Sequence, residues 1–150
     1  MSDSLSHRGE KAGLRARLTA DVPVLHDELH DDVFMRSRSS GHPWAPLPPD
    51  QSPFAVPTPA NPATAEFSIV ELATGDLAGV ASLWGIDQHN RNANIGITLR
   101  PAYRGRGIGT DTVRLLTDYG FTTRGLHRLQ IGTLADNRAM IHTALAAGFT

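Results

Sequence analysis

The most constraining feature of this chain is a glycine-rich loop, RGRGIG at residues 104–109, which lies between a strand pattern and a helix pattern. Residues 93–99 have the character of a strand, and residues 110–123 carry apolar side chains at a mostly helical spacing. Glycines let successive backbone N–H groups turn toward one point, and the helix that follows adds unpaired amides and the positive end of its dipole. The arrangement therefore predicts a pyrophosphate site, and a connecting turn that binds nothing is the alternative left open.

The spacing within the loop excludes two common nucleotide-binding motifs. A P-loop requires a lysine directly after its last glycine, whereas Thr110 follows Gly109 here. A dinucleotide fingerprint requires G-x-G-x-x-G and an acidic residue after a second strand, and the chain has neither. Arg104 and Arg106 supply local charge, and the planar fork of arginine suits phosphate oxygens.

Composition limits the classes of protein to consider. The chain has 150 residues, of which 40% are hydrophobic, so we predict a single domain over 1–150 with a flexible segment at 1–12. The formal net charge of −1 argues against nucleic-acid binding, and the lack of cysteine excludes disulfides and thiolate nucleophiles. The first residues lack the apolar stretch of a signal peptide, and no apolar run reaches the roughly 18 residues that span a membrane. We therefore expect a cytoplasmic protein with no membrane partner.

The first part of the chain predicts a strand, a helix and a long loop. Residues 14–18 alternate like a half-buried strand, and a helix is expected from residue 19 or 21 to residue 31 or 34. Residues 36–63 hold eight of the ten prolines, so we predict a proline-rich loop in which Trp44 and Phe54 fold back onto apolar surface. The inward face of the helix is expected to hold Val22, Leu25, Leu29 and Val33.

The second part predicts two hairpins before the glycine loop and a strand and a helix after it. The expected strands are 67–72, 77–84, 93–99 and 128–134, with turns at 74–76 and 88–92. Residues 137–147 predict a helix that Gly148 ends. Its inward side chains are expected to be Met140, Ile141, Ala144 and Leu145.

The loop and the segments around it resemble the GNAT superfamily of N-acetyltransferases. RGRGIG matches that superfamily's cofactor signature of Arg or Gln, two residues, Gly, one residue, and Gly or Ala. ADNRAM at 135–140 and AGF at 147–149 resemble the second signature, in which an asparagine opens a helix that ends in Gly-Phe; Asn137 and Gly148 have the required spacing. The resemblance covers residues 65–150 and is greatest for the RimJ/RimL-like branch, which includes ribosomal-protein N-terminal and spermidine acetyltransferases.

The resemblance implies an α/β (α+β) fold with a mixed central sheet and helices on both faces, and acetyl-coenzyme A as co-substrate. The implied reaction is direct transfer of an acetyl group to a primary amine of a small molecule or a protein N-terminus. In this family the pantetheine arm lies along the strand before the glycine loop, and the second-signature asparagine lies near the far end of that arm. Asn137 is also a good helix N-cap, and both roles can hold together. The cofactor-binding residues so implied are Ile97, Thr98, Leu99, Arg104, Gly105, Arg106, Gly107, Ile108, Gly109, Thr110 and Asn137.

The acid–base residues are less well defined. Many relatives carry Glu where Asn94 stands and Tyr where Ala144 stands, and neither an amide nor a methyl group can transfer a proton at neutral pH. By chain position Asp87 and His89 are the candidate catalytic residues, although both residue types also favour solvated turns. The alternative function is a coenzyme A-binding module that has lost catalysis.

One further pattern and the end of the chain bear on partners. His26 and His30 have the i, i+4 spacing of zinc ligands, but no third ligand is evident and the sequence is not HExxH, so we predict no metal. The acidic residues around them hint at a cationic acceptor. Relatives continue past Gly-Phe with two more strands, so we expect strand 128–134 to keep an open edge here. We expect either that this sequence is a piece of a longer chain or that a second copy of the chain completes the sheet.

Overall fold

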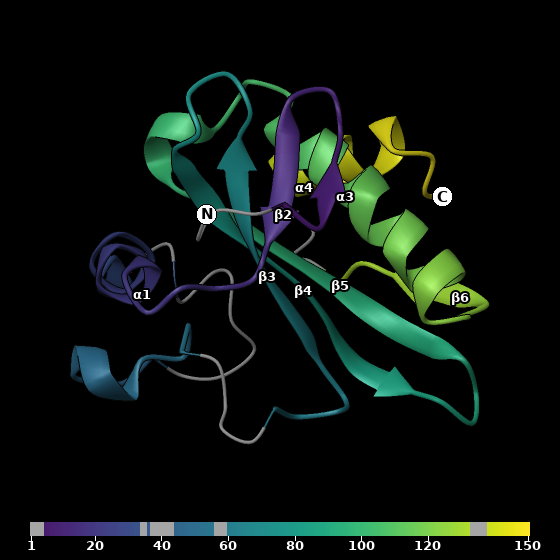
Figure 1. Cartoon of the computed structure of the whole chain (residues 1–150), viewed down its shortest axis with the longest axis horizontal. Coiled ribbons are helices and arrows are strands. Elements are labelled where there is room, and N and C mark those ends of the chain that lie inside the picture. Colours follow the sequence, from purple (N-terminus) through teal and green to yellow (C-terminus); the bar gives the residue numbers. More distant parts are fainter. Residues whose placement is uncertain (1–4, 34–35, 37–43, 56–59, 133–137) are drawn as a thin grey trace.

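A computed structural model describes residues 5–33, 36, 44–55, 60–132 and 138–150 of this chain. Its centre is a six-stranded sheet whose strands follow chain order (Figure 1). The first five strands pair antiparallel, and the last pairs parallel to its neighbour because a helix connects the two. The strands are β1 His7–Arg8, β2 Ala12–Arg15, β3 Ala65–Glu71, β4 Leu77–Asp87, β5 Asn92–Leu99 and β6 Arg128–Gln130.

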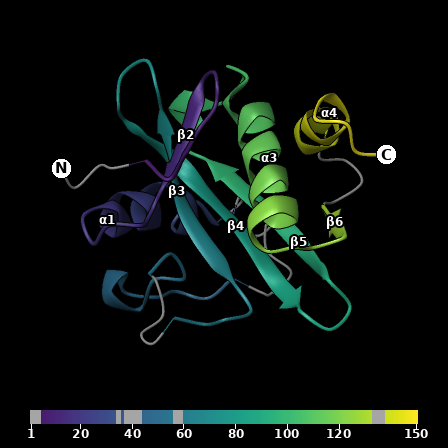
Figure 2. The same ribbon diagram turned by 45° about the vertical axis from the view of Figure 1, so that its right-hand side comes forward.

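Helices cover both faces of this sheet, as predicted. Helix α1, Asp21–Leu25, continues into the π-helical turn His26–His30, and both lie on one face. Helix α3, Ile108–Asp118, continues into the π-helical turn Tyr119–Thr123 and lies on the opposite face. Helix α4, Arg138–Ala146, lies beside α3 (Figure 2). The predicted mixed sheet with two covered faces is confirmed.

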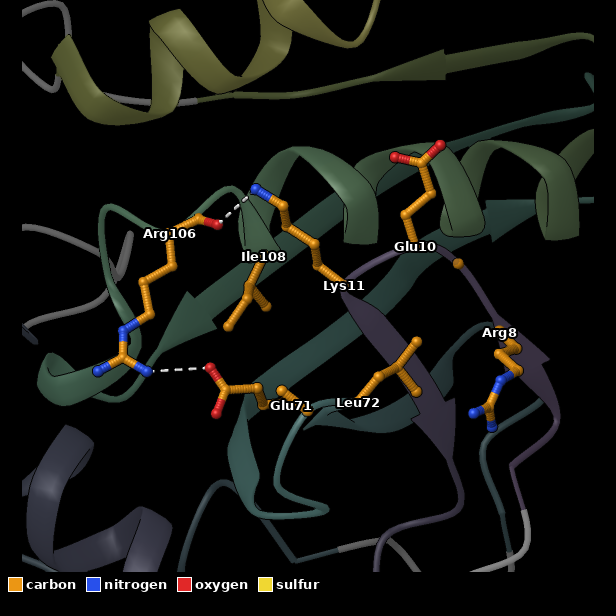
Figure 3. A pocket seen from close by; sticks show the side chains of 9 residues that line it. Arg8, Glu10, Lys11, Glu71, Leu72, Arg106 and Ile108 are labelled. Atoms are coloured by element: carbon orange, nitrogen blue, oxygen red, sulfur yellow. Dashed lines mark hydrogen bonds and ion pairs between the residues drawn. The ribbon is translucent and has the colours of Figure 1, made fainter.

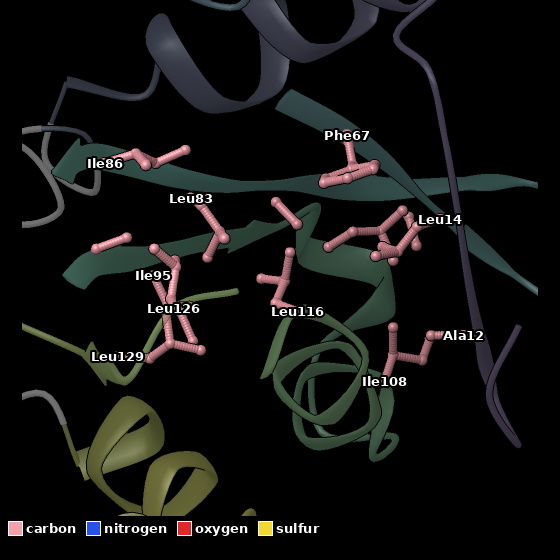
Figure 4. Close-up of a cluster of buried hydrophobic side chains, with 14 residues drawn as sticks. Ala12, Leu14, Phe67, Leu83, Ile86, Ile95, Ile108, Leu116, Leu126 and Leu129 are labelled. Carbon is pink, nitrogen blue, oxygen red and sulfur yellow. The ribbon is translucent and has the colours of Figure 1, made fainter. Parts of the chain in front are cut away.

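The main hydrophobic core lies between the sheet and α3 (Figure 4). Apolar side chains on one face of β2 to β6 point into it, largely at alternate positions along each strand. Leu116 and Ile108 of α3 are almost fully buried against it. A smaller cluster on the other face joins α1 to the sheet through Leu25, Leu29, Phe54 and Val80. Phe54 therefore folds back onto apolar surface as predicted.

The N-terminal segment differs from its predicted form. We predicted a strand at 14–18, but β2 begins at Ala12, and His7 and Arg8 pair with Leu14 and Gly13. The predicted flexibility of residues 1–12 stays a prediction. The cause is a contact made 99 residues along the chain, because the Asp111 carboxylate accepts the Ala12 backbone N–H at 2.8 Å. Local alternation could not reveal that partner.

The inward faces of two helices were predicted only in part. Leu25 and Leu29 are buried as expected, but Val33 is 46% exposed. The π-helical turn adds a residue to the helical repeat, because the Asp31 N–H donates to the His26 carbonyl five residues before it. The extra residue rotates the positions after the turn, so Val33 no longer points in the same direction as Leu25 and Leu29. In α4 the prediction was wrong for Ile141 and Leu145, which are exposed among the described residues.

The remaining elements lie close to their predicted positions. The proline-rich segment contains one short 3₁₀ turn, Pro49–Gln51, among its described residues. Strand β4 extends past the predicted end at residue 84, and β6 is shorter than the predicted strand 128–134. In the described part of the chain, no helix has the length and apolar character needed to cross a membrane.

Candidate functional site

The glycine loop joins the end of β5 to the start of α3 through a 3₁₀ turn, Pro101–Tyr103. Gly105 and Gly107 have φ angles of 75° and 83°, in the left-handed region that glycine alone enters readily. A side chain at Gly105 would meet no atom within 4 Å, so the backbone conformation is what requires glycine there. The loop therefore turns back on itself twice immediately before the helix.

The N-terminus of α3 opens at this loop. Gly107 is the N-cap residue, and no side chain in the described structure caps the helix. The buried side chain of Ile108 fixes the first turn to the core. The first N–H groups of α3, including those of Gly109 and Thr110, therefore have no acceptor within the helix and can bind an anion. The positive end of the helix dipole attracts the same negative charge.

Both loop arginines already have partners within the protein. Arg104 donates from Nε to the Leu99 carbonyl at 3.1 Å. Arg106 forms an ion pair of 3.0 Å with Glu71, and its guanidinium lies over the Tyr103 ring at 5.5 Å. Both arginine side chains are exposed, so they stay within reach of solvent and of an incoming phosphate.

One edge of β5 is open along most of its length. Strand β6 pairs only with Asn92, Ala93 and Asn94, and no strand pairs with the β5 edge beyond them in the described structure. The predicted residues Ile97, Thr98 and Leu99 lie on this open stretch, directly before the loop. An extended arm can therefore lie along this edge of β5, where the Leu99 carbonyl accepts from Arg104 Nε, and end at the N-terminus of α3.

Helix α4 closes the third side of this region. A Cβ on Gly109 would lie 3.7 Å from Leu99 Cδ1 and 3.7 Å from Thr143 Cγ2, so the end of β5, the start of α3 and the middle of α4 converge there. The predicted residue Asn137, just before α4, lies outside the described residues. Its role stays a prediction.

The structure places Asp87 and His89 in the β4–β5 turn. The Asp87 carboxylate accepts the backbone N–H groups of His89 and Asn90 at 3.0 Å each and the Asn90 side-chain amide at 2.8 Å. The bonds from Asn90 lower the pKa of Asp87, which makes it a weaker proton acceptor. This turn lies at the far end of β5 from the glycine loop, about 23 Å away at the usual rise per strand residue.

A second carboxylate, Glu66, lies on the α1 face of the sheet. Strand pairing places Glu66 opposite Ser82, and Ser82 opposite Gly96 of β5. Burial raises the pKa of Glu66, and the nearby Arg17 guanidinium, 3.6 Å from the carboxylate, only partly opposes this shift. We did not single out Glu66 from the sequence. The sequence did contain a clue: Glu66 is a carboxylate that alternates along the strand with Ser68 and Val70, which are buried on the same face.

The aromatic side chain next to this row is Trp84. It is 50% exposed, pairs across the strands with Asn94, and lies 3.6 Å from the position a Gly96 Cβ would take. Because Gly96 has no side chain, the Trp84 indole and the Ser82 hydroxyl lie close over this part of β5. The surface combines an indole with a carboxylate, groups that attract cationic amines.

The two histidines with zinc-ligand spacing lie with Asp31, and the potential ligand atoms of the three residues lie within 4.8 Å of one another. The imidazole rings of His26 and His30 stack at 4.6 Å with a 14° angle, which does not aim their in-plane lone pairs at one ion. His26 lies 2.8 Å from the Leu47 carbonyl through Nε2 and 2.9 Å from Ser52 Oγ through Nδ1. These contacts fasten the proline-rich segment to the helix.

Comparison with known proteins agrees with this geometry. The family model described as acetyltransferase (GNAT) domain matches residues 13–150. Spermidine N(1)-acetyltransferase of Escherichia coli (strain K12) is 34% identical over 76 residues, which are 51% of this chain and 41% of that protein. A putative ribosomal N-acetyltransferase, YdaF, of Bacillus subtilis (strain 168) is 38% identical over 66 residues, 44% of this chain and 36% of that protein. The matched regions thus span about two-fifths of the length of these curated relatives.

Solved structures extend the likeness of fold to nearly the whole chain. The structure of spermidine N-acetyltransferase from Vibrio cholerae in complex with CoA and spermine superposes with a TM-score of 0.78 and 21% identity, covering 93% of this chain and 81% of that one. Together with the family match over residues 13–150, this identifies the chain as a member of the GNAT acetyltransferase family.

Proposed function

We propose that this protein is an acetyl-coenzyme A-dependent N-acetyltransferase of the RimJ/RimL-like branch that acts on a primary amine. The observation that carries the proposal is the open edge of β5, which leads straight to the glycine loop and the uncapped start of α3. Relatives named as spermidine and ribosomal N-acetyltransferases support it. Because the match covers only part of those relatives, the acceptor has to be identified by experiment.

Coenzyme A fits the residues present. The pyrophosphate is proposed to bind the N–H groups of residues 105–110, where two left-handed glycines and the helix start leave donors exposed. The pantetheine arm is proposed to pair with the open backbone of Ile97 to Leu99. Asn137 is proposed to bind the arm from the α4 side. The co-substrate supplies the acetyl thioester, and backbone N–H groups of β5 can polarise its carbonyl.

The amine is proposed to approach from the α1 face, beside Trp84 and the Glu66–Ser82–Gly96 row. The nucleophile must be the neutral amine, so the ammonium has to lose a proton first. Glu66 suits this role better than Asp87 or His89, because burial raises the pKa of Glu66 toward the working pH while Asn90 lowers that of Asp87. Glu66 lies two strands from Gly96, about 10 Å, so the transfer is proposed to pass through water.

The acceptor is proposed to be a small primary amine or polyamine, with a protein N-terminus as the second candidate. The carboxylate and the exposed indole on the acceptor face favour a cation. A homo-oligomer is also proposed, since a structure of the Vibrio cholerae relative is described as dodecameric.

The test combines a binding measurement with a turnover assay. Thermal denaturation with and without coenzyme A should show a rise in melting temperature, because a ligand that binds only the folded state stabilises it. Thiol release is then measured with spermidine, spermine, simple alkylamines and a peptide with a free N-terminus. Binding without turnover on any amine would favour a coenzyme A-binding module that has lost catalysis. An unchanged melting temperature would contradict the proposed cofactor site.

A further inference from the structure

A cavity of about 550 Å³ lies behind the glycine loop, on the side away from α4 (Figure 3). Its walls are the turn of the β1–β2 hairpin, the residues that follow β3, and Arg106. Lys11, the only lysine of the chain, extends from the hairpin turn across this cavity to the loop. Its ammonium donates to the Arg106 carbonyl at 3.2 Å.

Arg106 is held from two directions. Lys11 binds its carbonyl, and Glu71 of β3 binds its guanidinium at 3.0 Å. Lys11 also packs along Gly107, since a Cβ there would lie 3.0 Å from Lys11 Nζ and 3.4 Å from Cδ. Gly107 therefore serves the left-handed turn and also leaves room for the lysine stem.

The direction of the Arg106 carbonyl fixes the direction of the next amide. A trans peptide unit is planar, and its C=O and N–H point to opposite sides. When Lys11 draws the Arg106 carbonyl toward the hairpin, the N–H of Gly107 turns away from the hairpin, toward the exposed side of the loop. That amide is one of the donors of the anion site proposed above.

The hairpin that carries Lys11 is itself anchored to α3. The Asp111 carboxylate accepts the backbone N–H groups of Lys11 at 2.9 Å and Ala12 at 2.8 Å. Gly9 permits this approach, because a Cβ at that position would collide with the Asp111 carboxylate. These two bonds hold the backbone of Lys11 against α3, within side-chain reach of the Arg106 carbonyl.

We propose that Lys11 is a positioning residue for the pyrophosphate loop, acting on the Arg106–Gly107 peptide from the side opposite the ligand. The inference rests on the proposed coenzyme A site. It assigns the N-terminal hairpin, which lies outside both signature motifs, a part in cofactor affinity. Because the contact orders the donor amides before the ligand arrives, its loss should weaken donors that carry the pyrophosphate and spare those that lack it.

The experiment compares four full-length proteins: wild type, Lys11→Met, Lys11→Arg and Arg8→Met. Arg8 lines the same cavity, and its replacement by methionine removes the same charge, but the Arg8 side chain makes no hydrogen bond or ion pair with the described residues. Calorimetry gives Kd for coenzyme A, and steady-state kinetics give KM and kcat with acetyl-coenzyme A and with acetyl-pantetheine, which lacks the pyrophosphate. Lys11→Met is expected to raise Kd and KM for the full cofactor about fivefold to tenfold, the loss typical of a charge-assisted hydrogen bond.

The control proteins distinguish a positioning role of Lys11 from the binding of coenzyme A itself. Lys11→Arg should recover most of the affinity, and Arg8→Met and the kinetics with acetyl-pantetheine should stay near wild type. An unchanged Kd in Lys11→Met, an equal loss in Arg8→Met, or an equal loss with both donors would overturn the positioning role. If wild type itself does not bind coenzyme A, the proposed function fails instead.

Discussion

The Asp111 carboxylate of α3 accepts the backbone N–H of Ala12 in β2 at 2.8 Å, across a separation of 99 positions in sequence. The same oxygen accepts the N–H of Lys11 at 2.9 Å. One buried carboxylate therefore joins the N-terminal hairpin to the first turn of the helix that begins at the glycine loop. The order of the hairpin and the geometry of the loop depend on each other.

Asp111→Ala should lower the free energy of unfolding by about 1–3 kcal/mol, because it leaves two backbone donors beside the core without an acceptor. Urea denaturation followed by circular dichroism measures this loss. Asp118→Ala is the matched control, since Asp118 lies on the same helix but is exposed. Equal losses in the two variants would show that the contact with the hairpin contributes nothing specific.

Gly105→Ala should weaken coenzyme A binding more than its effect on stability explains. Gly105 and Gly75 have nearly the same left-handed φ, 75° and 79°, and open space around the Cβ position. Alanine at either site should therefore cost about 1–2 kcal/mol of stability from backbone strain alone. Only Gly105 lies in the loop. Calorimetry should show a higher Kd for Gly105→Ala and an unchanged Kd for Gly75→Ala, and equal Kd values would argue against a phosphate site here.

Glu66→Gln should reduce kcat/KM by about 100-fold or more, the usual contribution of a general base. Burial raises the pKa of Glu66, and only its carboxylate form accepts a proton, so wild-type activity should fall as pH falls through this raised pKa. The variant should lose that acid limb. Asp87→Asn distinguishes the two candidates, because an amide oxygen can still accept the turn hydrogen bonds. If the acid limb disappears in Asp87→Asn and not in Glu66→Gln, the sequence-based candidate is right.

Asp21→Asn should destabilise the protein by about 3–5 kcal/mol at neutral pH, because it removes the negative charge from a buried ion pair. Burial alone would raise the pKa of Asp21, but bonds from Arg15, the Leu18 N–H and Ser68 outweigh it and lower the pKa. A lowered folded-state pKa gives stability that is complete above the unfolded value and lost as pH falls through the folded value.

Denaturation midpoints measured from pH 7 downward test this pH dependence. Wild type should lose stability in acid, and Asp21→Asn should show a smaller loss over the same range. Asp27→Asn, an exposed carboxylate on the same helical segment, should follow wild type. If wild type and Asp21→Asn lose the same stability as the pH falls, the Asp21 carboxylate is not the source of the pH dependence.

The sequence alone determined the parts of the site that depend on neighbours along the chain. Strand alternation, helical spacing and the glycines of residues 104–109 are local properties, so β5, the loop and α3 appear where they were predicted. Ile97, Thr98 and Leu99, which we propose for the pantetheine arm, were predicted from the resemblance to the family, and they lie on an open strand edge.

Tertiary structure decided what depends on contacts across the sheet. Lys11 reaches the loop from a hairpin that Asp111 binds, and Glu66 shares a cross-strand row with Gly96 of β5 because two strand registers align them. The π-helical turn at His26–His30 rotated the end of the first helix away from its predicted face. The positions of Lys11 and Glu66 depend on partners far apart in sequence, whereas periodicity reports only which way a residue faces within its own element.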